Sequence, residues 1–127
     1  MLAAADGLLP SVRSLMAEQS FHKALDALWQ IVGDANRYVD EQAPWTLRKT
    51  DPARMATVLY VLADTVRRLA LLLQPFTPDS MAKMLDQLAV PASARSFASF
   101  DSPLKAGTTL PAPQGVFPRF VDADAST

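Results

Sequence analysis

The chain has 127 residues, half of them apolar, and a formal net charge of −1 at pH 7. This length is sufficient for one domain with a real core, and the charge excludes a protein that attracts nucleic acid by its overall charge. The absence of cysteine excludes disulfides, thiol nucleophiles and zinc-finger ligands, and it is compatible with the reducing cytoplasm, where we expect the protein to act. The longest apolar run, Leu69 to Leu73, is far too short to cross a bilayer, so we expect no membrane partner.

Two helical segments are expected in the first third of the chain. Residues 2–18 carry alanine and leucine at helical spacing, and we expect a kink or break at Pro10, which cannot donate a backbone hydrogen bond. Ser20 is a suitable N-cap for a second helix, which should run to about Ala43 because Pro44 forces the preceding residue out of helical geometry. The apolar residues of this helix recur at intervals of four and three, which places them on one face: Phe21, Leu25, Leu28, Val32, Ala35 and Val39.

Two further helices share a start signal, a capping residue followed by proline. Asp51-Pro52 predicts the start of a third helix, and Thr77-Pro78 predicts the start of a fourth that ends near Ala89. The fourth helix carries Met81, Met84, Leu85 and Leu88, and the main stripe of the third comprises Met55, Val58, Leu62, Val66, Leu69, Leu73 and Phe76.

The third helix has a second set of apolar side chains. Tyr60 and Leu71 point to roughly the opposite side from the main stripe, so we expect this helix to be covered on more than one face.

The composition of the sequence changes after residue 90. Residues 91–127 hold five prolines and two glycines without a sustained period, which predicts a short helical turn around residues 94–100 and then an extended tail. We expect Phe117 and Phe120 to anchor this tail to an apolar surface, and the last residues to be disordered. No segment alternates as a strand does, so the predicted fold is all-α: an antiparallel helical bundle over residues 1–90, followed by the tail.

No motif in the sequence predicts catalysis or a metal site. His22 is the only histidine, and without cysteine it has no co-ligands of the usual kind, so it is expected at the surface. Asp40 and Glu41 are neighbours on a helix, which points their carboxylates about 100° apart rather than into one site. The chain by itself is expected to catalyse nothing and to hold neither a metal nor a cofactor.

One strip of the second helix combines groups that could contact a ligand. On a helical wheel, Trp29, Gly33, Asn36, Asp40 and Pro44 fall on one strip beside the apolar stripe. A glycine inside a helix destabilises it by about 1 kcal/mol relative to alanine, and it marks close approach of either a packed helix or a ligand. The amide of Asn36 carries a donor and an acceptor, which suits the edge of a nucleobase.

A tryptophan and three cations follow this strip. Trp45 comes directly after Pro44, and Arg48, Lys49 and Arg54 follow within nine residues. An aromatic face beside cations is typical of a platform for single-stranded nucleic acid. The pattern leaves two alternatives open: Trp45 plugs the end of the bundle, and the cations form an ordinary solvated corner.

Three stretches carry a resemblance to a known family. The string "ANRYVDEQAPWTLRKTD", residues 35–51, closely resembles the anticodon-binding domain of methionyl-tRNA synthetase. The similarity continues through "VLYVLADTVRRLALLLQPFTP", whose Leu-x-Pro-Phe-x-Pro junction class I synthetases share more widely, and through "VFPRF". It covers most of residues 10–121.

The resemblance implies roles for individual residues. It implies that Trp45 stacks on an anticodon base with Pro44 fixing its approach, and that Asn36 lies near the base edges. Gly33 departs from the family, because many relatives have an acid at that position.

The resemblance also implies a longer enzyme. The first helix of the family's domain, with a further asparagine and arginine for the anticodon, would precede Met1, as would a catalytic domain that uses ATP and Mg as substrates. The implied partners are the anticodon loop of methionine tRNA and that catalytic domain of the same chain. The side of the third helix with Tyr60 and Leu71 is then expected to have lost a neighbour.

Two alternatives remain from the sequence. One is a stand-alone helical interaction domain whose protein partner packs on the third helix. The other is the related bundle of a valine, isoleucine, leucine or cysteine synthetase, against which the Pro44-Trp45 pair argues.

Overall fold

The computed structural model describes residues 1–117 as helices and connecting segments, without a β-strand in that range. The six α-helices are α1 (Leu2–Asp6), α2 (Leu8–Ala17), α3 (Phe21–Gln42), α4 (Pro44–Thr50), α5 (Pro52–Leu73) and α6 (Pro78–Gln87). Two short 3₁₀ turns follow, at Ala92–Ala94 and Phe97–Ser99. The all-α prediction is therefore confirmed.

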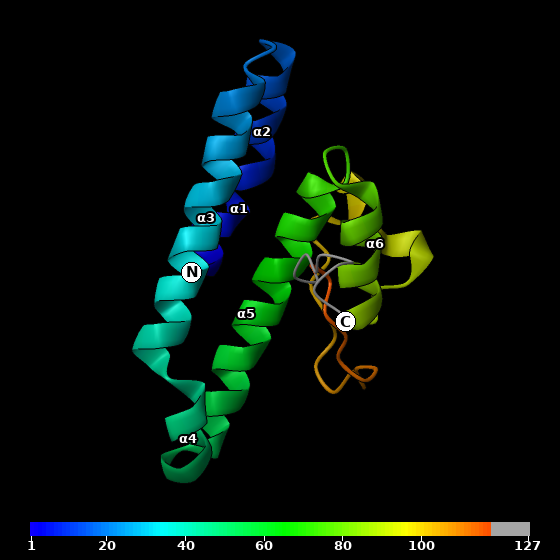
Figure 1. Cartoon of the computed structure of the whole chain (residues 1–127). Helices are drawn as coiled ribbons and strands as arrows, with labels where there is room; N and C mark the ends of the chain where they lie inside the picture. The colour runs from blue at the N-terminus through cyan, green and yellow to red at the C-terminus, as the bar shows by residue number, and fades with distance from the viewer. Residues whose placement is uncertain (118–127) are drawn as a thin grey trace, which may run out of the picture.

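The helices form an antiparallel bundle whose tip is made by α4. α3 runs antiparallel to α2 and continues to the tip at the lower end of Figure 1. There α4 joins α3 to α5, which returns along the bundle. α6 packs on α5 on the side away from α2 and α3 (Figure 1). Both α3 and α5 have 22 residues, so each is about 33 Å long at 1.5 Å per residue.

The predicted helix starts are confirmed, although only one of them uses its side-chain cap. The Arg54 backbone N–H donates to Asp51 Oδ1 at 3.1 Å, and Pro52 occupies the first position of α5. Pro78 likewise begins α6. Ser20 and Thr77 stand at N-cap positions but form no capping hydrogen bond through their side chains. For these two helices, the start is set by backbone geometry and packing.

The predicted break at Pro10 is wrong by three residues. The helix is interrupted at Gly7, and Pro10 is the third residue of α2. Backbone N–H groups in the first turn of a helix have no partner within that helix, so proline is tolerated there. Its ring would crowd the carbonyl four residues earlier, that of Asp6, and this is where α1 ends.

The buried face of α3 is turned by about one residue from the predicted stripe. Ala24, Leu28 and Ile31 are buried, whereas Phe21 and Leu25 of the predicted stripe are exposed. α2 packs on the face of α3 that carries Ala24, Leu28 and Ile31, and it leaves the face with Phe21 and Leu25 partly uncovered.

Two apolar clusters share α5. One lies between α2, α3 and α5, and its buried members are Leu8, Leu9, Val12, Ala24, Leu28, Ile31, Leu69, Leu72 and Phe100. The other lies between α5 and α6 and comprises Ala70, Leu71, Met81, Leu85 and Val90. The prediction that α5 is covered on more than one face is confirmed.

The expected open side of α5 is, however, covered by this chain itself. Leu71 is fully buried under α6, and the Tyr60 hydroxyl donates to the Leu104 carbonyl oxygen at 2.7 Å. The expectation of a lost neighbour at these two residues is therefore wrong, because α6 covers Leu71 and the segment after α6 folds back to Tyr60. The interaction-domain alternative loses the surface on which it relied.

A group of buried charges fastens that returning segment to α5. The Asp64 carboxylate accepts from Arg67 Nε at 2.7 Å and from the Leu104 backbone N–H at 3.1 Å. Arg67 also donates to the carbonyl oxygens of Ser99 and Phe100, at 3.0 and 2.8 Å. The core thus tolerates these charges because nearly every donor has an acceptor.

A second arginine extends the group toward the N-terminus. Arg68 is paired with Asp6 of α1, its Nε lies 3.3 Å from Asp64 Oδ2, and its guanidinium lies 5.4 Å from the centre of the Phe100 ring. The Nε contact is an ion pair by distance only, because it lacks hydrogen-bond geometry. We refer to Asp64, Arg67 and Arg68 as the buried charge cluster.

The tail is extended as far as the structure describes it. The predicted turn around residues 94–100 is present as the two 3₁₀ turns, and no helix follows between residues 101 and 117. Phe117 remains exposed at the edge of a groove, and Phe120 lies outside the described residues. Within residues 1–117, none of the helices combines the length and apolar character that a membrane span requires.

Candidate nucleic-acid interface

The stretch after Pro44 is a helix, which the sequence did not predict. Pro44 begins α4 as well as ending α3, and Trp45 is the second residue of the new helix. A helix of seven residues is too short to be stable in isolation, so its neighbours must hold it in place. Pattern analysis misses such a helix because two turns do not establish a period.

The corner between α3 and α4 has an unusual backbone conformation. Ala43 has φ 46° and ψ 66°, which is the left-handed region, and its N–H donates to the Val39 carbonyl oxygen at 2.9 Å. Glycine usually occupies this position after a helix, because a side chain there adds strain. The chain therefore reverses at a defined angle, without a flexible glycine, just before Trp45.

Trp45 is free rather than a plug at the end of the bundle. Its side chain is 60% exposed, and α4 contains no buried residue. An indole with this exposure can accept a flat ring on its surface, since no apolar neighbour seals it. The alternative in which Trp45 plugs the end of the bundle is therefore wrong, and the nucleic-acid platform stays a prediction.

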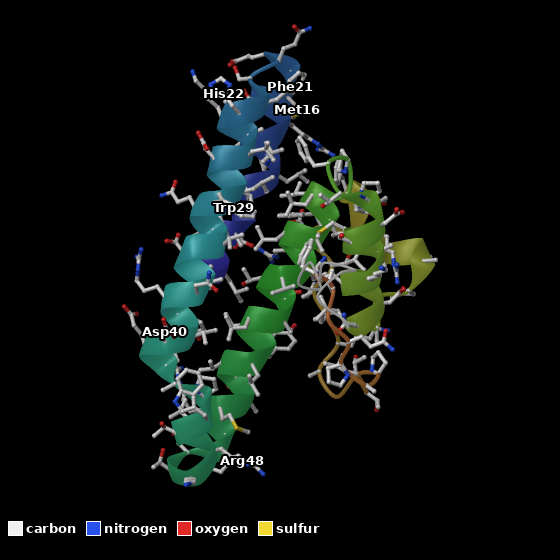
Figure 2. All side chains as sticks on the ribbon, viewed as in Figure 1. Met16, Phe21, His22, Trp29, Asp40 and Arg48 are labelled. Carbon is white, nitrogen blue, oxygen red and sulfur yellow. The ribbon has the colours of Figure 1, made fainter. Side chains whose placement is uncertain are left out.

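The cations gather at the same tip. Arg48 and Lys49 lie in the last turn of α4, where basic residues also face the negative end of the helix dipole. Arg48 projects outward at the lower end of the molecule in Figure 2. Neither forms an ion pair with any of residues 1–117, so both positive charges remain uncompensated by the described part of the chain.

Arg54 has a partner that the sequence did not indicate. Its Nη2 donates to Gln42 Oε1 at 3.1 Å, which ties the first turn of α5 to the last residue of α3. Its guanidinium is therefore directed toward the end of α3, although the residue remains exposed. A guanidinium has five N–H donors, so four remain available.

The strip on α3 is exposed, and it extends away from the tip. Trp29, Gly33, Asn36 and Asp40 are all exposed. Asn36 precedes Pro44 by eight residues, which is about 12 Å along the helix axis. Nothing lies within 4 Å of a Cβ added at Gly33, so no helix among the described residues packs closely on it.

A large apolar groove lies beside this strip and was not predicted. It has a volume of about 550 Å³ and is bounded by α3, α5 and α6, with lining residues that include Leu25, Trp29, Val32, Leu73, Met84 and Phe117. The signal in the sequence was the apolar stripe of α3, which is wider than α2 can cover. Asn36 contributes the amide at its edge.

No catalytic or metal-binding constellation is apparent in the described residues. His22 is exposed at the start of α3, as predicted, and is labelled there in Figure 2. Across residues 1–117, acidic and histidine side chains do not come together in threes in a way that could hold a metal ion.

Comparison with known proteins identifies the family. A family model described as the anticodon binding domain of methionyl tRNA ligase matches residues 1–127. The chain belongs to this family. The match decides against the valine, isoleucine, leucine and cysteine alternatives, since the matching family is specific for the methionine enzyme.

Relatives place this anticodon-binding domain within longer ligases. The chain is 55% identical over 125 residues to a methionine–tRNA ligase of Brucella suis, with 98% of this chain and 24% of the relative covered. It is 51% identical over 127 residues to the corresponding ligase of Rhizobium meliloti, of which it covers 25%. The chain thus spans about a quarter of the length of the curated relatives it matches.

Solved structures agree with the fold of the anticodon-binding domain. The apo form of Mycobacterium tuberculosis methionyl-tRNA synthetase superposes with a TM-score of 0.92 at 49% identity, over 95% of this chain and 25% of that one. The form of the same enzyme bound by methionyl-adenylate gives a TM-score of 0.90 at 50% identity, over 92% of this chain and 24% of that one.

Proposed function

We propose that the tip formed by α4 binds the anticodon loop of methionine tRNA, with the Trp45 indole stacked on an anticodon base. The observation that supports this proposal is the exposed indole on a helix without buried residues, beside uncompensated cations. Stacking of one base on an aromatic side chain contributes about 1–3 kcal/mol to binding. Pro44 fixes the direction of approach because it begins α4 directly before the tryptophan.

The cations and the α3 strip contact different parts of the anticodon loop. Arg48, Lys49 and Arg54 attract the phosphates of the loop, because a near-neutral chain needs a local positive patch to hold a polyanion. Asn36 lies further along α3, where its amide suits a base that is turned out of the loop toward the helix.

The longer protein is proposed to join methionine to its tRNA with the use of ATP. This activity is inferred from the family, and Mg and ATP would be bound by a catalytic domain outside these 127 residues. One structural neighbour, the M. tuberculosis enzyme, has methionyl-adenylate bound. The domain described above would supply recognition, and the catalytic domain of the same chain would be its permanent partner. We propose the cytoplasm as the site of action.

The Trp45→Ala change in the longer protein tests the proposal. Loss of one stacked base should lower kcat/KM for tRNA charging by roughly 5- to 150-fold, the rate equivalent of the stacking energy. Methionine-dependent ATP–pyrophosphate exchange should be unchanged, because that reaction does not use the anticodon.

Trp45→Phe is the matched variant, because phenylalanine keeps an aromatic face at the same place. It should recover a large part of the charging that Trp45→Ala loses. Unchanged charging in Trp45→Ala would contradict the stacking role. Equal loss of charging and exchange would show that Trp45 maintains the fold of the enzyme.

A further inference from the structure

The position of Trp45 depends on contacts outside its own helix. α4 has no buried residue, so packing in the core does not fix it. Its position is set by its contacts with α5 and by its two ends: the left-handed Ala43 connects it to α3, and Asp51 joins it to α5. Any freedom of α3 relative to α5 at this end would therefore move the indole.

One side-chain contact closes this end of the bundle. Gln42 Oε1 accepts from Arg54 Nη2 at 3.1 Å, and the two residues are 12 positions apart in the sequence. Among residues 1–117, it is the single side-chain hydrogen bond between α3 and α5. Its two residues flank α4 in the chain, and α4 packs on α5. The Arg54 backbone is itself fixed by the Asp51 cap, so the bond has a rigid anchor on one side.

The chemistry of the acceptor matters as much as its position. Gln42 is neutral, so it orients the guanidinium without cancelling its charge. A carboxylate at the same place would form a charge-assisted pair and would remove the positive charge that a phosphate needs. The amide therefore orients the guanidinium and preserves its charge.

We propose that Gln42 is a positioning residue for tRNA binding. It holds the Arg54 guanidinium across the tip, which fixes α4 and the Trp45 indole, and it leaves the charge of Arg54 free for a phosphate of the anticodon loop. The proposal rests on the proposed function of the tip and adds to it a residue that itself contacts no tRNA.

The first test is Gln42→Met in the longer protein, since methionine has a similar size but does not accept strongly from a guanidinium. We expect KM for tRNA to rise several-fold, with kcat for charging and ATP–pyrophosphate exchange within about twofold of the unchanged enzyme. Gln30→Met is the matched control, because Gln30 is an exposed glutamine of the same helix that makes no hydrogen bond through its side chain within residues 1–117. It should leave KM unchanged.

A spectroscopic measurement separates positioning from a merely structural role. In protein labelled with 5-fluorotryptophan, the Trp45 resonance is identified by its absence in Trp45→Phe. Gln42→Met should shift or broaden this resonance, whereas Gln42→Glu should leave it in place because glutamate still accepts from Arg54.

The charge of Arg54 is tested by the same Gln42→Glu variant. Its affinity for tRNA should fall, and the slope of log affinity against log salt should become shallower by about 0.7, the value for one phosphate contact to a single strand. An unchanged slope would overturn the assignment of Arg54 to a phosphate.

The outcomes distinguish this inference from the proposed function. If Gln42→Met leaves both KM and the Trp45 resonance unchanged while Trp45→Ala impairs charging, the positioning role is wrong and the function of the tip stands. If Trp45→Ala charges tRNA normally, the proposed function of the tip is wrong, and the positioning role that rests on it is wrong as well.

Discussion

The two halves of α5 differ sharply in what surrounds them. Eight of the nine buried residues of this helix lie between Asp64 and Leu72, whereas Val58 is the one buried residue before them. The C-terminal half packs between two apolar clusters and carries the buried charge cluster. The N-terminal half extends to the exposed tip, where α4 packs against it. A single helix thus joins the stable part of the domain to its candidate recognition surface.

This contrast means that stability and recognition depend on separate residues. Burial of charge is tolerated only when partners replace the lost water, and Arg67 has such partners in Asp64 and two carbonyl groups. At the tip, the cations keep their hydration and remain available to a ligand. Substitutions in the C-terminal half of α5 and at the tip should therefore differ in their effect on the free energy of unfolding, and three variants test this.

The largest change in the free energy of unfolding is expected from Asp64→Asn. The change keeps the shape of the side chain but leaves Arg67 and Arg68 without their buried counter-charge, since Asp6 is largely exposed and pairs only with Arg68. We expect the free energy of unfolding to fall by about 3–5 kcal/mol, as measured by urea denaturation of the 127-residue chain.

Asp26→Asn is the control for this measurement. Asp26 is an exposed acid on α3 and forms no ion pair with the described residues, so its substitution should change stability by less than about 0.5 kcal/mol. A similarly small effect for Asp64→Asn would show that the buried charge cluster does not fasten the segment after α6 to α5.

A smaller effect of opposite sign is expected from Ala43→Gly. Glycine adopts the left-handed conformation of this corner without strain, so the free energy of unfolding should rise by about 0.5–1 kcal/mol. Ala56→Gly, at an exposed position inside α5, should instead lower it by about 1 kcal/mol. Thermal denaturation of both variants measures the difference, and destabilisation by Ala43→Gly would contradict the assigned backbone strain.

The smallest effect on stability is expected from Trp45→Ala. Truncation of a large aromatic residue in a core destabilises by about 3–5 kcal/mol, but this side chain is 60% exposed, so we expect a change within about 0.5 kcal/mol. Urea denaturation again provides the measurement. A loss of 2 kcal/mol or more would assign Trp45 to the packed part of the molecule.

The sequence predicted the regular parts of the fold because their signals are local. Asp51-Pro52 and Thr77-Pro78 mark helix starts by the chemistry of one turn, and the 3.6-residue period marks long helices. The break at Gly7 was displaced to Pro10 because a proline in the first turn of a helix resembles a proline that ends one.

The parts that could not be predicted depend on distant partners. Arg67 and Arg68 look like surface residues in the sequence. Arg67 is buried because Ser99 and Phe100 supply acceptors more than thirty residues later, and Arg68 is buried between Asp6, Asp64 and the Phe100 ring. The candidate tip shows the same division. Trp45 and its neighbouring cations were found from composition and resemblance, but the Gln42–Arg54 hydrogen bond was not, because no pattern relates two residues on separate helices.

The lack of buried side chains in α4 has a consequence for how this domain can change. Exposed residues that no core requires can be replaced with little loss of folding, so variation at the exposed positions of this helix is filtered mainly by ligand preference. Libraries randomised at Trp45, Thr46, Arg48 and Lys49 should consequently yield folded proteins at high frequency, and selection from them could redirect the domain toward another loop sequence.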